Sequence, residues 1–188
     1  MNVVFRKHLE EIITLTDTEF EQILLHFTVK RLKKHQFVIQ AGSLIDHEYF
    51  VISGLLRSSY TNEDGKVHII QFAMENWWIS DYHALITQTN AIFDIDCLED
   101  VELLSLSSGS KKKLCEEFPI MEHFFRVKTT AGYVGLQQRI LSLLNNDAQS
   151  RYQKLFAQYP VLFQRVPKAL IASYLGVSRE TLSRLSNI

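Results

Sequence analysis

The segment Val166–Leu185, VPKALIASYLGVSRETLSRL, is the most informative stretch of this 188-residue sequence. Pro167 suits the first turn of a helix, because the N–H group that proline lacks is not needed there. Leucine and isoleucine then follow at helical spacing, Gly176 permits a tight turn, and Ser178 is a favoured N-cap for another helix. The pattern therefore predicts two short helices joined by a glycine-containing turn.

The second of these helices is predicted to have two different faces. Leu182 and Leu185 point inward, and polar or charged residues occupy the other side. Recognition helices place such residues in the major groove of DNA, where Arg donates two hydrogen bonds to guanine and Glu accepts one from cytosine. The predicted DNA-binding residues are Lys168, Ser178, Arg179, Glu180, Thr181, Ser183 and Arg184. The alternative is an ordinary helical hairpin with a charged outer face.

The charge distribution favours a nucleic-acid contact near the carboxyl end. Residues 151–188 contain six lysine and arginine side chains and one glutamate, which gives this segment a net charge of +5. Because the chain as a whole has a net charge of -1, residues 1–150 carry -6. Binding to phosphates needs a local positive potential and does not need a basic protein.

Residues 29–106 show the period of β-strands. Apolar and polar residues alternate around Phe37, Tyr49 and Val67, and glycines and the turn Asn62–Gly65 separate the runs. We predict a compact antiparallel sandwich or barrel, with an irregular or helical insertion at 77–90. Two short helices are predicted before it, the second opened by a capping box from Thr16 to Glu19.

A long helix is predicted after Pro119, and it contains a heptad pattern. The seam residues are Ile120, Phe124, Val127, Ala131, Val134, Gln138 and Leu141. This seam either packs against the protein's own sheet or pairs with a second copy in a parallel homodimer, and we predict the homodimer. Gly132 and Gly135 each weaken a helix by about 1 kcal/mol relative to alanine, so we expect a hinge or a close contact near Gly135.

The sequence contains no recognisable catalytic or metal-binding motif. The seven histidines are scattered, and neither a G-x-S-x-G elbow nor a P-loop occurs. Asp94 and Asp96 are expected on the same face of one strand, where they are either an acid–base pair or part of a solvated surface. Cys97 and Cys115 are expected to be buried. We therefore predict no enzyme activity, no catalytic residue, no metal and no cofactor. With no membrane-spanning run or signal peptide, the chain is predicted to be cytoplasmic, with no membrane partner.

From about Val29 to Arg184 the sequence resembles the Crp/Fnr superfamily of bacterial transcription regulators. The matching runs are Gly42, YFVISGLLR at 49–57, DGK at 64–66, IQF at 70–72 and, most specifically, IASYLGVSRETLSR at 171–184. In this family, residues at the positions of Arg179, Glu180 and Arg184 read bases. The long helix before them forms the dimer interface.

The resemblance implies an α+β fold of three parts. These are N-terminal helices with a cyclic-nucleotide-binding-like jelly roll (double-stranded β-helix) at 1–118, a dimerisation helix at 119–135 and a helix-turn-helix domain at 136–188. The implied partners are double-stranded DNA with a palindromic site, a second copy of the chain, RNA polymerase and an unidentified small-molecule effector. The effector is expected to reorient the DNA-binding part about a hinge near Gly135.

Two departures from the family pattern limit this expectation. Cyclic-nucleotide binders hold the phosphate with an arginine, but this sequence has no arginine from Lys66 to Leu106 and carries Asp81 at the corresponding turn. We therefore expect poor binding of cyclic nucleotides. The family's β wing is also absent after Arg184, which is expected to lower the affinity for DNA.

Another small molecule is the expected effector. The predicted pocket residues are Arg57, Gln71, Trp77, Trp78, Ser80, Asp81 and Tyr82. The two tryptophans are alternatively core residues. Two further hypotheses remain: a small-molecule-binding β-barrel or cupin-like metalloenzyme, and a regulator fold that has lost DNA binding.

Overall fold

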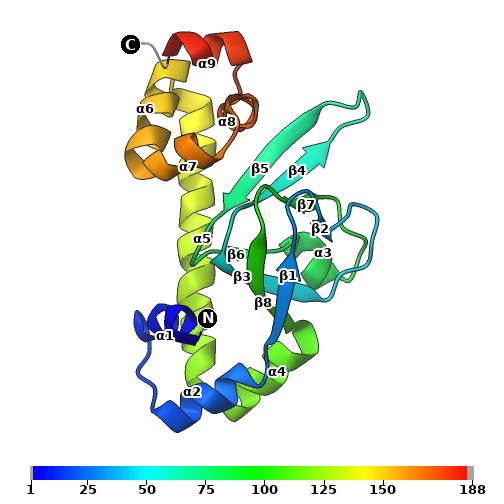
Figure 1. Ribbon diagram of the computed structural model, residues 1–188, viewed down its shortest axis with the longest axis vertical. Coiled ribbons are helices and arrows are strands. Elements are labelled where there is room, and N and C mark those ends of the chain that lie inside the picture. The colour runs from blue at the N-terminus through cyan, green and yellow to red at the C-terminus, as the bar shows by residue number, and fades with distance from the viewer. Residues whose placement is uncertain (1, 186–188) are drawn as a thin grey trace. The chain divides into compact units, whose positions relative to one another are not determined.

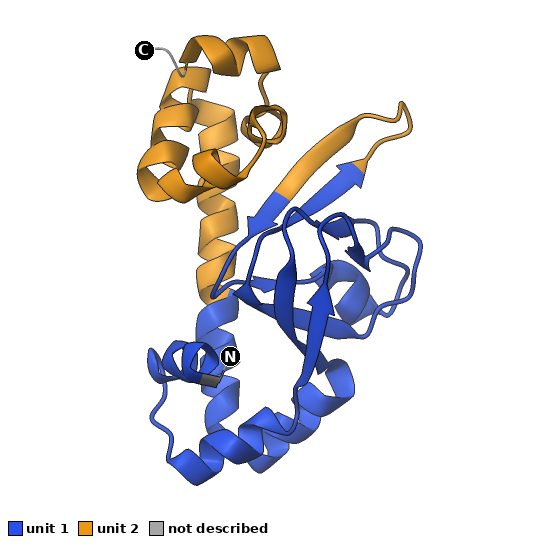
Figure 2. Cartoon of the chain, viewed as in Figure 1, with its two compact units in different colours: residues 1–60, 71–129 blue, residues 61–70, 130–188 orange. Residues whose placement is uncertain are grey.

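The computed structural model describes residues 2–185, and the chain divides into two compact units. Unit 1 comprises Met1–Tyr60 and Gln71–Thr129, and unit 2 comprises Thr61–Ile70 and Thr130–Ile188 (Figure 2). Among the described residues there are eight strands and nine helices (Figure 1). The strands are β1 (Thr28–Leu32), β2 (Phe37–Ile39), β3 (His47–Ser53), β4 (Leu56–Thr61), β5 (Val67–Ala73), β6 (Trp78–Ile79), β7 (Asp94–Cys97) and β8 (Val101–Ser107). The helices are α1 (Asn2–Glu10), α2 (Asp17–Leu24), α3 (Tyr82–Thr87), α4 (Ser108–Glu117), α5 (Ile120–Asn145), α6 (Ala148–Gln158), α7 (Pro160–Arg165), α8 (Lys168–Leu175) and α9 (Arg179–Leu185).

The strands form two four-stranded sheets, which confirms the predicted antiparallel β body. Their orders are β1-β8-β3-β6 and β2-β7-β4-β5. Gly54, between β3 and β4, has a φ of 93°, and a Cβ atom there would collide with the carbonyl oxygen of Asp100. Only glycine therefore fits this turn.

The inner space between the sheets is filled with apolar side chains. Because side chains alternate along a strand, alternate residues of the inner strands face this interior, as Tyr49 and Val51 of β3 do. The buried cluster consists of Val38, Ile39, Tyr49, Val51, Leu56, Ala73, Ile79, Ala84, Ala91, Ile95, Cys97, Val101 and Leu103. Cys97 is fully buried in it, and burial raises the pKa of its thiol to about 11. Cys115 is half-buried, and burial likewise raises its pKa to about 11, so both thiols stay protonated at neutral pH.

A second core, rich in aromatic residues, joins the N-terminal helices to the β body within unit 1. Phe5 of α1 lies 5.0 Å from Phe50 of β3 and 6.4 Å from Trp78 of β6, measured between ring centroids. Phe124 and Phe125, in the first turns of α5, contact the Trp78 ring from the other side at 6.5 and 5.7 Å. The predicted capping box at Thr16 is present and begins α2.

His8 is the titratable group inside this aromatic core. The residue is 4% exposed, and its Nε2 accepts a hydrogen bond from the Trp78 indole N–H at 3.3 Å. Burial, reinforced by the nearby Lys128 ammonium, lowers the pKa of His8 to about 4. The imidazole is therefore neutral in the folded protein at physiological pH.

The neutral state of His8 leads to a pH-dependent stability. Its pKa is about 4 when folded and about 6.5 when unfolded, so protonation favours the unfolded chain as the pH falls from 6.5 towards 4. We expect His8 to contribute about 3 kcal/mol to this loss at most. Urea unfolding of His8→Phe at several pH values should show a shallower decline than the wild type. His83→Phe, which replaces an exposed histidine, is the control, and an unchanged decline in His8→Phe would contradict this assignment.

The long helix predicted after Pro119 is present as α5. It runs to Asn145, so the expected domain boundary after residue 135 lies inside it, and α5 contributes to both units. Gly132 and Gly135 are ordinary helical positions, and a Cβ atom on either would meet nothing within 4 Å. The expected close contact near Gly135 is therefore wrong within one chain, since the space beside both glycines is open.

Candidate nucleic-acid interface and effector region

The helices α8 and α9 form the predicted pair with a tight turn. Gly176 ends α8 in the left-handed conformation, with a φ of 68°. Ser178 then accepts a hydrogen bond from the backbone N–H of Thr181 at 3.1 Å and so caps the start of α9. Leu182 of α9 is 2% exposed and Ile171 of α8 is 1% exposed, because the apolar faces of the two helices are buried within unit 2.

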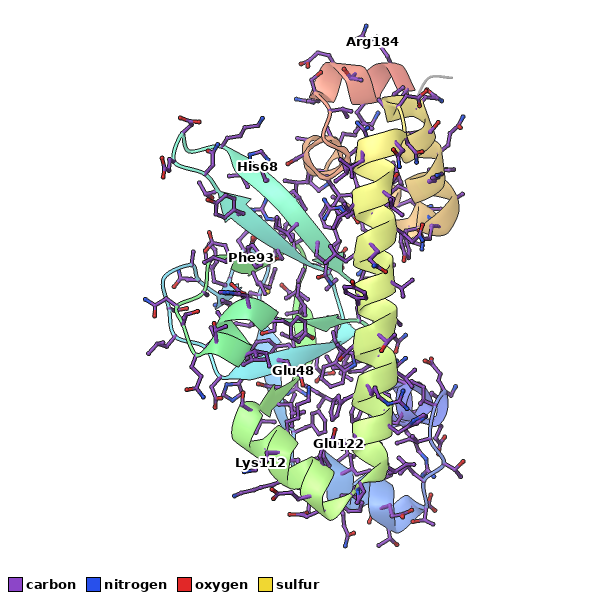
Figure 3. The ribbon with its side chains drawn as sticks, turned by 180° about the vertical axis from the view of Figure 1, so that it is seen from behind. Glu48, His68, Phe93, Lys112, Glu122 and Arg184 are labelled. Carbon is purple, nitrogen blue, oxygen red and sulfur yellow. The ribbon has the colours of Figure 1, made fainter. Side chains whose placement is uncertain are left out.

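The outer face of α9 carries the predicted base-reading residues. Arg179, Glu180, Ser183 and Arg184 are exposed, and Thr181 is half-buried. Figure 3 shows the Arg184 side chain extending outward from α9. Hydrogen bonds from its own backbone N–H and from Ser178 lower the pKa of Glu180, so this carboxylate remains an acceptor at neutral pH. One face therefore presents guanidinium donors and a carboxylate acceptor together. The expected absence of a wing concerns residues beyond Leu185, outside the described part of the chain.

Arg151, one of the six cations in residues 151–188, stabilises the fold through hydrogen bonds to backbone carbonyls. The Arg151 Nε donates to the carbonyl of Leu175 at 2.9 Å, and its Nη1 donates to the carbonyl of Asn146 at 2.7 Å. These bonds satisfy carbonyls at the ends of α8 and α5. The net charge of +5 for residues 151–188 therefore overstates the positive charge that is available to bind DNA.

The predicted effector residues make contacts within the protein in different parts of unit 1. Trp78 belongs to the aromatic core, and Trp77 packs against the cluster inside the β body, as the core alternative predicted. Arg57 forms an ion pair with Asp96 at 2.7 Å, and Ser80 donates to the carbonyl of His47 at 2.8 Å. Gln71 makes a long hydrogen bond of 3.5 Å to the carbonyl of Trp78.

Asp81 has a structural role that the sequence did not indicate. Its side chain is fully buried, and its carboxylate accepts from the backbone N–H groups of Ala84, Ile92 and Phe93 at 3.1, 2.8 and 3.3 Å. The carboxylate caps α3 and fastens it to the loop before β7. Backbone donors of this loop thus already hold an anion of the protein's own, which argues against a cyclic phosphate here.

A buried ion pair lies at the start of β3. The carboxylate of Glu48, which is 3% exposed, is 2.6 Å from the Lys111 ammonium of α4. Tyr82 hydrogen-bonds to the same carboxylate, and its pKa is raised by burial of the hydroxyl and by the charge of Glu48. The Tyr82 residue as a whole is 43% exposed, so its hydroxyl is buried while part of the ring faces solvent. Tyr82 is thus engaged within the protein.

Two surface pockets in unit 1 lie away from the predicted effector residues. One, of about 220 Å³, is formed by residues 37–40, 43–47 and 49 around the loop between β2 and β3. The other, of about 600 Å³, lies beside His26 and Glu117, whose side chains form a hydrogen bond of 3.0 Å. Neither contains any of the seven residues.

The carboxylates and histidines do not form a metal centre in the part of the chain that the structure describes. No three His, Cys, Asp or Glu side chains there are placed to hold an ion. Asp94 and Asp96 are also engaged separately, since Asp94 accepts from the N–H of Ala41 at 2.9 Å and Asp96 pairs with Arg57. Within residues 2–185, no helix has the length and apolar character needed to cross a membrane.

The family comparison agrees with the two-sheet architecture. The family model described as cyclic nucleotide-binding domain matches residues 29–118. This segment is therefore similar to a cyclic nucleotide-binding domain. No curated protein matches the sequence.

Solved structures extend the resemblance beyond residues 29–118. The c-di-GMP responsive global regulator CLP of Xanthomonas campestris is 16% identical, with a TM-score of 0.74, over 92% of this chain and 90% of that chain. FixK2 of Bradyrhizobium japonicum is 16% identical, with a TM-score of 0.73, over 86% and 83%. The catabolite activator protein of Thermus thermophilus is 21% identical, with a TM-score of 0.56, over 92% and 83%. The resemblance to Crp/Fnr regulators is confirmed at the level of the fold, and the cupin-like alternative is not favoured.

The role of Asp81 can be tested by removing its charge. Asp81→Asn puts an amide N–H₂ group among three backbone donors, so we expect a loss of about 1 to 3 kcal/mol in the free energy of unfolding. Asp46→Asn, at an exposed position, is the matched control and should change the free energy little. Urea unfolding monitored by tryptophan fluorescence provides the measurement. Equal stability of the two variants would mean that the three hydrogen bonds do not hold α3.

Proposed function

We propose that this protein is a homodimeric transcription regulator of the Crp/Fnr type, which binds a palindromic DNA site through α9. The observation that carries the proposal is that α9 exposes a polar face and buries an apolar one. The tight turn before α9 and its N-cap hold the helix in this position. The resemblance in fold to known regulators supports it. This function requires no catalytic residue, metal or cofactor.

The first turn of α9 supplies the proposed base contacts. Arg179 is placed to read guanine and Glu180 to accept from cytosine, with Ser183 and Arg184 on the same exposed face. Lys168, exposed at the start of α8, is proposed to contact a phosphate, because the first helix of such a pair crosses the DNA backbone. Ser178 and Thr181 position α9 through its cap.

The second half of α5 is the proposed dimer surface. Val134 and Leu141 of the heptad seam are 46% and 49% exposed, and Ala131 and Gln138 lie exposed on the same seam. The apolar residues exposed around them are Tyr133, Leu136, Ile140, Leu143 and Leu144. Large apolar side chains gathered on one helix are typical of an interface. The open space beside Gly132 and Gly135 would let a partner helix approach closely.

The first part of the predicted seam differs from the rest. Phe124 is fully buried in the aromatic core of unit 1, so it is not available to a partner, and Val127 is half-buried. The proposed dimer contact therefore begins near Ala131. A two-fold axis along this contact would present the two α9 helices to half-sites about 34 to 36 Å apart.

The β body is proposed to sense an effector other than a cyclic nucleotide. The carboxylate of Asp81 and the absence of an arginine from Lys66 to Leu106 argue against a cyclic phosphate. An effector would act by favouring one of two settings of the DNA-binding helices, the general basis of coupling between ligand and DNA. RNA polymerase is proposed as a further partner.

Base reading by Arg179 can be tested with DNA selected from a random pool by the wild-type protein. Arg179→Ala should weaken specific binding by about 1 to 3 kcal/mol and relax the preference at one base pair. Lys168→Ala should weaken binding to all sequences and reduce the salt slope by about 1. Fluorescence anisotropy over a salt series measures both quantities.

The control for these variants is Arg126→Ala, which removes an exposed arginine of unit 1 that contacts His123. It should bind DNA like the wild type. If Arg179→Ala bound the selected DNA as tightly as the wild type, α9 would not be the reading helix. If the wild type selected no sequence, the proposed function would be wrong.

Dimerisation can be tested by placing charge on the exposed seam. Leu141→Glu should convert a dimer into a monomer of 21.8 kDa, because paired carboxylates in an apolar interface are unfavourable. Ile86→Glu, at a residue that is 78% exposed in unit 1, is the control and should remain dimeric. Size-exclusion chromatography with light scattering gives the masses. A wild-type monomer would contradict the proposed interface.

A further inference from the structure

The guanidinium of Arg139, on α5, contacts two other segments of unit 2. Its Nη2 donates to the carbonyls of Ile69 and Tyr174 at 3.0 and 3.3 Å, and its Nη1 donates to the carbonyl of Ile70. The guanidinium carbon also lies 3.9 Å from the centre of the Tyr174 ring. Arg139 thus links α5, the end of α8 and strand β5.

The environment of Arg139 is unusual for a cation. Burial lowers the pKa of its guanidinium, and the partners that the described residues offer to it are carbonyls and an aromatic ring, with no carboxylate. A buried charge without a counter-ion is unfavourable unless its hydrogen bonds are well satisfied. Placing the guanidinium here therefore costs free energy of folding. The hydrogen bonds that Arg139 makes to the carbonyls are the most direct reason for its presence at this position.

Ser173 makes a second connection between the same two elements. Its Oγ donates to the carbonyl of Val67 at 3.2 Å and accepts from the N–H of Ile69 at 3.4 Å. Strand β5 is at the edge of its sheet, where backbone groups would otherwise lack partners. Ser173 and Arg139 together bind four of these groups within the segment Thr61–Ile70, which we call the hairpin tip.

The contacts on α8 lie at the turn that leads to α9. Arg139 binds the carbonyl of Tyr174 and Arg151 binds the carbonyl of Leu175, the last two residues before Gly176. Carbonyls in the last turn of a helix have no partner within the helix, so these two arginines supply it. The direction in which α9 leaves the turn depends on how this end of α8 is held.

We infer that Arg139 is a positioning residue that makes the orientation of α8 and α9 depend on the hairpin tip. This inference rests on the proposed function, since orientation matters here because α9 reads DNA. The hairpin tip belongs to the same compact unit as α8 and α9, and by chain connectivity it continues β4 and β5 of the sensor domain. The hairpin tip is thus covalently continuous with the two strands and hydrogen-bonded, through Ser173 and Arg139, to α8 and α5.

This role differs from a phosphate contact in what it predicts. A residue that contacts phosphate contributes to the salt dependence of binding, whereas a buried positioning residue changes affinity without changing that dependence. Arg139→Met keeps the apolar stem and removes every hydrogen bond. We expect this variant to bind selected DNA weaker by a factor of about 10, with the salt slope of the wild type.

Hydrogen exchange of the free protein tests the connection without DNA. Arg139→Met should increase exchange both in residues 61–70 and in residues 168–175, because both segments lose partners. Ser173→Ala, a milder change, should increase exchange in residues 61–70 and lower DNA affinity to a smaller degree. Arg126→Met, on the same helix but with an exposed side chain, is the matched control and should change neither quantity.

The outcomes separate the inference from the proposed function. Faster exchange in both segments, with weaker DNA binding at an unchanged salt slope, supports the positioning role. Unchanged exchange in residues 61–70 in both variants overturns the connection, and faster exchange with unchanged DNA affinity overturns the positioning role. A wild-type protein that selects no DNA overturns the proposed function and the positioning role with it, while the exchange data still decide whether Arg139 holds the two segments together. If Arg139→Met fails to fold, Ser173→Ala gives the same comparisons.

Discussion

The packing of aromatic rings around Trp78 is the contact on which the rest of unit 1 depends. It brings together α1, β3, β6 and the beginning of α5, which are far apart in the sequence. Such ring pairs contribute about 0.5 to 1.5 kcal/mol each beyond the burial of their surface. Because α5 starts in this core, the face that it exposes further along is fixed by which of its residues the core takes up.

Buried polar groups hold the joints between elements. Asp81 fastens α3 to the loop before β7, Glu48 and Lys111 join β3 to α4, and Arg139 joins β5 to α8. Each group satisfies backbone atoms or an opposite charge that would otherwise be buried alone. At Asp81, the backbone N–H groups of the loop before β7 are bound by the protein's own carboxylate.

The sequence predicted what depends on local rules. The turn at Gly176, the cap at Ser178 and the alternating strands follow from the conformational needs of single residues and from side-chain periods. The sequence did not show whether Trp78 belongs to the core or lines a pocket, because an aromatic residue on a strand gives the same sequence pattern in both cases. Nor did the heptad pattern show that Phe124 belongs to the core and Leu141 to the surface, since both obey one helical period. Arg139 carried no signal at all, as its partners are backbone carbonyls about 35 and 70 residues away.

The continuity of α5 has a consequence for how this protein can change during evolution. An α-helix advances about 1.5 Å and turns about 100° with each residue. Inserting or deleting one residue between Phe124 and Arg139 would therefore rotate every later side chain by that angle relative to the aromatic core. Arg139 and the exposed seam residues would then lie at other angular positions on the helix relative to Phe124. Substitutions in this stretch can be tolerated, but a change in its length would alter the angular positions of all later side chains on the helix. Homologues are therefore expected to differ in length within loops instead.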